Sequence, residues 1–233
     1  LRYFAHLRKT APPGYSVVML AGNHEIDVLS RAADGEKVGL SEKKIEFLGS
    51  MDIVRKQGSV LYLHRYPSLG LVQSLWHQYR TQGGDPDTWD INRRFHEAVS
   101  VMRHSPEHSK AVFRECDDGG DGQALSGLSS EEYYRKHGSL IGRFLNEMGI
   151  TTVIHGHKIQ KEGGQKFEQY IPGIFMVNID AGISSGKNPE HRHRIGSIEI
   201  APVSGGGIEI TCAYRPGIKS GQGDVRIRKT TVH

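Results

Sequence analysis

Residues 17–25, Val17-Val18-Met19-Leu20-Ala21-Gly22-Asn23-His24-Glu25, join an apolar run to a group of polar side chains. The β-branched and apolar stretch from Tyr15 to Ala21 is typical of a buried strand. Gly22 predicts a sharp turn after that strand, and Ile26 to Ala33 then predicts a helix. This order of strand, turn and helix indicates an α/β fold.

Two other apolar runs also end at residues that can bind a metal ion. Ser59 to Leu63 leads into His64, and Ile150 to Ile154 leads into His155-Gly156-His157. In open α/β sheets, ligand-binding side chains gather at the carboxyl ends of the strands, so we expect Asn23, His64 and His157 to share one site. Imidazole nitrogens together with an amide oxygen suit zinc, iron or manganese better than calcium.

The ordered set of motifs resembles one known family. Gly22-Asn23-His24-Glu25 is similar to the third motif of the phosphoprotein-phosphatase branch of the calcineurin-like metallophosphoesterases. Gly156-His157 resembles the last metal motif of that family, and Asn178-Ile179-Asp180-Ala181-Gly182 resembles the strand and turn that follow it. The resemblance spans about Val17 to Gly182. It implies a partial metallophosphoesterase β-sandwich core, flanked by helices and lacking its first strands.

The resemblance also implies roles for individual residues. Asn23, His64 and His157 would bind the second ion of a two-metal site holding manganese, iron or zinc. His24 would be the general acid that protonates the leaving alkoxide, and Glu25 would lie beneath the turn and hold it. The implied reaction is in-line attack on phosphorus by a hydroxide that the two metals activate.

Two further residues are candidates at the edge of the site. The family has glycines after the histidine that corresponds to His64, whereas this chain has Arg65-Tyr66-Pro67. Arg65 is either a phosphate-binding group or a surface arginine. His155 is either a supporting residue of the site or a core residue. Leu20-Ala21 stands where the family often has a phosphate-binding arginine.

The motifs that carry the first metal of the family, Asp-x-His and Gly-Asp-x-x-Asp-Arg-Gly, have no counterpart before Gly22. We therefore expect the chain to be an N-terminally truncated fragment. Such a fragment would hold at most one ion weakly and would have little or no activity. A longer form with the upstream segment would be active with manganese. A cytoplasmic location is expected, although a missing N-terminus leaves a signal sequence open.

Composition sets the broad class of partner. The chain has 233 residues, a net charge of +4 and 13 histidines, which suits an anionic substrate. No apolar stretch approaches the ~20 residues of a membrane helix. Cys116 and Cys212 fit no metal or redox spacing and are expected to be free or buried thiols. We expect a phosphorylated protein or small molecule as the partner, and neither a membrane nor a nucleic acid.

The chain is expected to form one domain over residues 1–214, followed by a disordered basic tail over 215–233. Residues 82–127 are predicted to be an insertion or cap with fewer buried apolar contacts than the sheet, near the mouth of the site, and with one helix at Asp90 to Met102. Strong helical patterns also cover Ser41 to Leu48 and Ser129 to Met148. Three more strands are expected, at Ile174 to Ile179, Ile195 to Pro202 and Gly207 to Tyr214, and the last two are predicted to form a hairpin.

Three functions stay open on the sequence. The leading hypothesis is a metal-dependent phosphomonoesterase, which would include protein phosphatases. A hydrolase of nucleotides or dinucleoside polyphosphates is the alternative within enzymes, and aromatic residues lining the pocket would favour it. The third hypothesis is a degenerate, non-catalytic phosphatase-like binding module.

Overall fold

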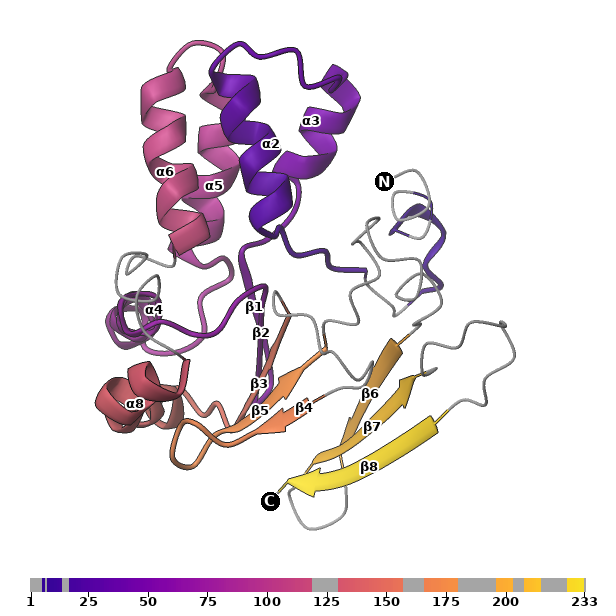
Figure 1. Ribbon diagram of the computed structural model, residues 1–233, viewed down its shortest axis with the longest axis vertical. Helices are drawn as coiled ribbons and strands as arrows, with labels where there is room; N and C mark the ends of the chain where they lie inside the picture. The colour runs from indigo at the N-terminus through magenta and orange to yellow at the C-terminus, as the bar shows by residue number, and fades with distance from the viewer. Residues whose placement is uncertain are drawn as a thin grey trace.

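A computed structural model describes the chain over a defined set of residues. The described residues are 6, 8–13, 17–118, 130–156, 166–179, 196–202, 208–214 and 226–232. They form a mixed α/β structure with two sheets and two groups of helices (Figure 1). The predicted α/β fold class is confirmed.

The larger sheet has five strands in the order β1-β2-β3-β5-β4. Its parallel centre consists of β2, β3 and β5, and an antiparallel strand lies at each edge. The predicted strands that lead into His64 and His155 are β2 and β3, which are paired in parallel, so both strands end at the same edge of the sheet. The five strands are β1 (Val54–Gln57), β2 (Val60–Leu63), β3 (Thr152–His155), β4 (Lys166–Glu168) and β5 (Phe175–Asn178).

The smaller sheet is an antiparallel meander of β6 (Gly196–Pro202), β7 (Ile208–Tyr214) and β8 (Arg226–Val232). The predicted hairpin of the first two strands is confirmed. The predicted disordered tail is wrong for Arg226–Val232, which pairs with β7 along its whole length. Basic residues are common on edge strands, where they oppose pairing with other molecules, and this explains the weak hydrophobic pattern of β8.

The two sheets pack face to face as a sandwich. Val60 of β2, Ile154 of β3 and Val177 of β5 form a buried cluster with Ile210 of β7. The alternate residues of the same strands point the other way, because successive side chains of a strand lie on opposite faces. Leu61 and its equivalents in β3 and β5 therefore belong to a different core.

That second face is covered by α4 (Leu69–Gln82) and α8 (Ser130–Glu147) (Figure 1). The helix predicted over Ser129 to Met148 is confirmed as α8 over its described part, and Gly149 has φ 69° after it. This left-handed conformation is the usual helix-ending role of glycine. Helix α4 was not predicted. Ser68 caps it, because the Ser68 hydroxyl accepts a hydrogen bond from the Leu71 N–H.

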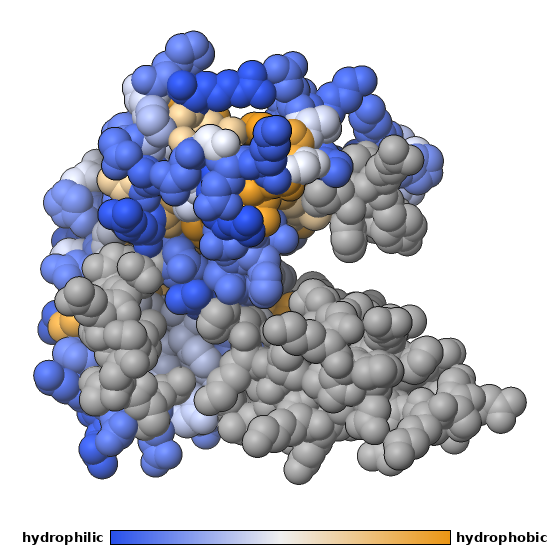
Figure 2. Space-filling model, turned by 45° about the horizontal axis from the view of Figure 1, so that its top comes forward, coloured by the Kyte–Doolittle hydropathy of each residue, from blue (hydrophilic) through white to orange (hydrophobic). Residues whose placement is uncertain are grey.

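A separate helical group, α2, α3, α5 and α6, has its own core. Figure 1 shows these helices together at one end of the molecule, and Figure 2 shows apolar side chains among the hydrophilic ones on that end. Residues 95–116 supply Phe95, Val99, Phe113 and Cys116 to this core. The described part of 82–127 therefore belongs to a buried core, and its protection relative to the sheet stays a prediction. The helices are α2 (Asn23–Ala33), α3 (Glu42–Gly49), α5 (Asp90–Val101) and α6 (Pro106–Asp118).

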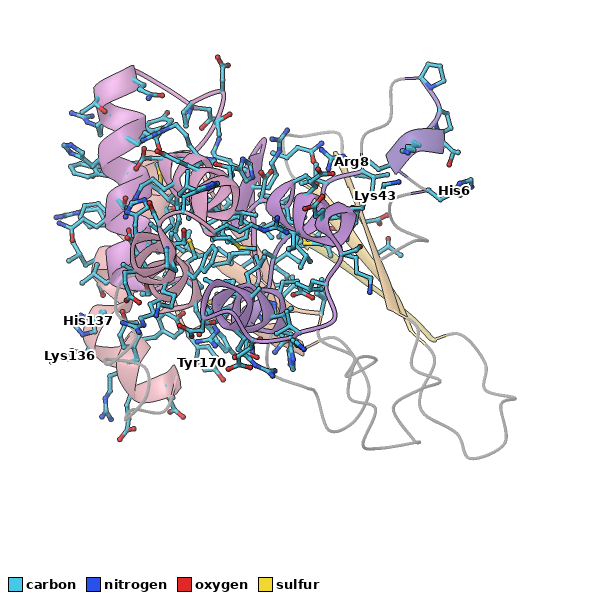
Figure 3. All side chains as sticks on the ribbon, turned by 90° about the horizontal axis from the view of Figure 1, so that it is seen from above. His6, Arg8, Lys43, Lys136, His137 and Tyr170 are labelled. Carbon is cyan, nitrogen blue, oxygen red and sulfur yellow. The ribbon has the colours of Figure 1, made fainter. Side chains whose placement is uncertain are left out.

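The strand predicted from Tyr15 to Ala21 is also wrong for its described part. Residues 17–21 make a single parallel bridge, Leu20 with Asp52, closed by hydrogen bonds on both sides of Asp52. Val18 is 42% exposed whereas Ala21 is buried, so this apolar run is only partly covered. Arg8, labelled in Figure 3 on the same side as Lys43 of α3, donates to the Ser50 hydroxyl at the end of that helix.

None of the described helices is both long enough and apolar enough to cross a membrane.

Candidate active site

Asn23 and His64 meet in the structure although 41 positions separate them. Asn23 is the first residue of α2, and His64 follows the last residue of β2. The His64 Nε2–H donates to the Asn23 Oδ1 at 2.8 Å. The His64 carbonyl accepts from the Gly156 N–H at 2.9 Å, which ties the ends of β2 and β3 together. Two of the three predicted ligands are thus in contact, and the third, His157, lies outside the described residues.

Gly22 allows this contact by leaving room for the imidazole. A Cβ at Gly22 would lie 2.7 Å from His64 Cε1 and 2.8 Å from Nδ1, closer than real Cβ atoms approach. The Gly22 N–H donates to Glu25 Oε2 at 2.9 Å, which closes the first turn of α2. The motif therefore combines a close approach at Gly22 with a side chain, Glu25, that holds the turn.

A small cavity of about 30 Å³ surrounds this pair. Residues of two different cores form its wall. Leu63 and Leu71 belong to the core between the larger sheet and its covering helices, whereas Ile26 and Cys116 belong to the core of the helical group. The site thus lies on the seam between the two cores. The lining residues are Ala21, Gly22, Asn23, Ile26, Ile53, Leu63, His64, Arg65, Tyr66, Leu71, Cys116 and Asp117.

Two other described histidines, His24 and His155, were predicted to lie at or near the site. Neither of them lines this cavity. His24 is exposed, on the turn of α2 next to Asn23. His155 is fully buried, and its ring packs on Tyr66 with the ring centroids 4.1 Å apart. Tyr66 itself lines the cavity, so His155 supports the wall through that aromatic ring.

Arg65 also lines the cavity and has an acidic partner. Its Nη2 lies 3.0 Å from Asp117 Oδ1, at the last turn of α6. The two side chains are 31% and 33% exposed. A cation is therefore present beside Asn23 and His64, and it is compensated by one carboxylate.

Cys116 places a sulfur in the same wall. Burial raises the pKa of its thiol from 9.0 to about 12, and the neighbouring Glu115 carboxylate adds to that rise. A nucleophilic cysteine needs a lowered pKa, so this thiol is a neutral packing group at physiological pH.

The donor atoms of Asn23 and His64 fit a shared metal ion. Asn23 Oδ1 and His64 Nε2 lie 2.8 Å apart, and an amide oxygen with an imidazole nitrogen would hold a zinc, iron or manganese ion. Binding would require the proton on His64 Nε2 to leave, because a ligating imidazole nitrogen is unprotonated. No group of three or more His, Cys, Asp or Glu side chains suited to a metal occurs within the described residues.

Sequence reasoning missed Cys116 and Asp117 as parts of the site. The segment from Cys116 to Gly122 looks like a turn, and nothing in its local pattern links it to His64. The available signal was the spacing of Val112, Phe113 and Cys116, which lie on one buried face of α6 and extend that helix to the cavity.

Comparison with known proteins identifies the family of the chain. No significant match to the chain was found among curated proteins or among solved structures. The profile of the calcineurin-like phosphoesterase family matches residues 1–161, which include Asn23, His64 and the described walls of the cavity. From this match, together with the Asn23–His64 pair at the end of the parallel strands, it follows that the chain belongs to the calcineurin-like phosphoesterase family.

Proposed function

We propose that this chain carries part of the active site of a metal-dependent phosphomonoesterase of the phosphoprotein-phosphatase branch, with a phosphorylated protein or small molecule as substrate. The contact between Asn23 Oδ1 and His64 Nε2, in a cavity shared with Arg65, carries the proposal. An amide oxygen, an imidazole and a guanidinium together suit a metal ion and a phosphoryl group.

Each side chain has a distinct task in this proposal. Asn23, His64 and His157 together hold one ion. Glu25 stabilises the turn on which Asn23 lies. Family members generally bind two divalent metals, which when bound lower the pKa of water and neutralise charge on the phosphoryl group. His24 gives a proton to the leaving alkoxide, and its exposure at the start of α2 leaves it accessible to a bound ester. Arg65 binds phosphoryl oxygens.

The aromatic residues near the cavity support a phosphomonoester over a nucleotide. Tyr66 is the aromatic residue among those that line the cavity, and its ring is packed against His155. Tyr134 and Tyr170 are stacked on each other, and Tyr134 is buried. Each of these described rings already packs against another ring, which leaves less ring surface on which a base would stack.

The test measures Mn²⁺ binding and hydrolysis of an aryl phosphate. In the 233-residue chain we expect weak binding and little turnover, because the described cavity offers an amide, an imidazole and a carboxylate already paired with Arg65. Asn23→Ala and His64→Ala should each weaken Mn²⁺ binding further.

In any longer natural form of the protein, we expect turnover that requires Mn²⁺. His24→Asn should lower that turnover by about 10²–10⁴-fold while leaving the metal content unchanged, as expected for a proton donor. Hydrolysis that persists in a chelator, or metal binding that ignores both ligand substitutions, would contradict the proposal. Binding of metal without any turnover would favour the non-catalytic module.

A further inference from the structure

Arg65 and Asp117 form an incomplete ion pair at the wall of the cavity. Their contact joins one guanidinium nitrogen, Nη2, to one carboxylate oxygen at 3.0 Å. Arg65 Nε is buried and has no hydrogen-bond partner among the described residues. Arginine pairs most strongly when two parallel N–H groups reach two oxygens, so this pair leaves part of the fork unused.

Asp117 is also poorly placed by the rules of its own helix. It lies in the last turn of α6, where the helix dipole is negative and disfavours a further negative charge, and no basic residue of α6 lies in that turn to offset it. Arg65 is therefore the compensating cation. Residues that break a local rule in this way are often found at functional sites.

We propose that Asp117 is a temporary counter-ion of Arg65 that a phosphoryl group displaces on binding. This inference rests on the proposed function, since it takes a phosphoryl group as the ligand. A phosphoryl group carries several oxygens, enough to engage both Nη2 and the unpartnered Nε of Arg65. The pair is weakly held because both side chains are about one-third exposed, so its exchange for a more highly charged anion is favourable.

The size of the cavity is consistent with displacement. A volume of about 30 Å³ has room for one or two waters or a single ion, and not for a phosphoryl group as well. Movement of the Asp117 side chain out of the wall would enlarge the cavity and remove a like charge in the same step.

Displacement makes Asp117 a residue that sets how strongly an anion must bind Arg65 to enter the site. A phosphomonoester dianion competes for Arg65 more strongly than a phosphodiester monoanion does, because its charge is twice as large. The site therefore prefers monoesters. Removing the Asp117 carboxylate should raise the affinity of the site for both anions.

The experiment is a calorimetric titration of the chain with inorganic phosphate. Asp117→Asn should tighten phosphate binding about tenfold, the size expected for removing one partly solvated like charge. Arg65→Gln should abolish phosphate binding. The double variant Arg65→Gln, Asp117→Asn should not bind phosphate either. Glu115→Gln is the matched control, because Glu115 lies on the same helix as Asp117, pairs with Arg94 of α5 and does not line the cavity. The phosphate affinity of this variant should equal that of the wild type.

A gain in affinity cannot come from damage to the fold, which makes the expected result specific. Weaker or unchanged phosphate binding by Asp117→Asn would overturn the proposal, as would the absence of binding by both the wild type and that variant. The titration is made without metal or ester, so a tightened Asp117→Asn with no Mn²⁺-dependent hydrolysis would count against the proposed function alone.

Discussion

Gly22 determines where the His64 ring can lie. An added methyl at Gly22 would meet His64 Cε1 at 2.7 Å, so Gly22→Ala should push the imidazole away from Asn23. We expect Mn²⁺ affinity to fall by roughly tenfold or more, as for other changes that reorient a ligand. Gly49→Ala is the control, because its methyl would meet Val99 at the same distance of 2.7 Å. Gly49 is the last residue of α3 and does not line the cavity. Gly49→Ala should cost stability and leave Mn²⁺ affinity unchanged; equal losses of affinity would contradict the prediction.

Cys116 gives the molecule a pH dependence on the alkaline side. The unfolded thiol loses its proton near pH 9, whereas burial keeps the folded thiol protonated to about pH 12. The unfolded state therefore binds fewer protons in this window, and stability should fall by up to about 1.4 kcal/mol per pH unit as the pH rises. Urea unfolding of the wild type and Cys116→Ala at pH 7.5 and 10 checks this, since the variant should lose less stability. A wild type that loses no more than the variant would show that the thiol is not protected.

At the scale of elements, one buried side chain joins α5 to β1. Asn92 Oδ1 accepts from the N–H groups of Ile53 and Val54, and its Nδ2 donates to the Val54 carbonyl. Asn92→Ala would leave these buried groups unpaired, so unfolding free energy should fall by roughly 2–4 kcal/mol. Arg93→Ala, on the exposed face of the same helix, should change it by less than about 0.5 kcal/mol. Comparable urea midpoints for the two variants would refute the assignment.

Elements were predictable where the pattern and the burial agree. The strands before His64 and His155 are apolar and lie in the buried parallel centre of the sheet, and α8 has a clear amphipathic pattern. The stretch from Tyr15 to Ala21 has the same composition, yet its described part makes one bridge, because strand formation requires a neighbour that composition does not reveal. The Asn23–His64 contact was expected from strand-end positions, although only the strand before His64 forms among the described residues. The place of Asp117 was not expected, because α6 brings it to the cavity through packing over long sequence distances.

For the whole molecule, the sandwich depends on a small shared core. Ile210 of β7 is fully buried against Val60, Ile154 and Val177 of the larger sheet. Ile210→Ala should destabilise the fold by roughly 2–5 kcal/mol, with the loss concentrated in the smaller sheet. Hydrogen exchange should show β6 to β8 losing protection before β3. Thr231→Ala, at an exposed position of β8, is the control; uniform loss of protection across both sheets would indicate one cooperative unit instead.

The position of the cavity on the seam between two cores has a consequence for how such a site evolves. Cys116 and Asp117 lie in the last turn of α6, whose Phe113 is fully buried among α2 and α5. A change of volume at Phe113 or Phe95 would shift the last turn of α6 and so alter the anion preference, without any change to the reacting groups. Inherited differences in substrate choice would then accumulate in hydrophobic positions remote from the chemistry. A library randomised at those two positions and selected on different phosphoesters would reveal such a route of adaptation.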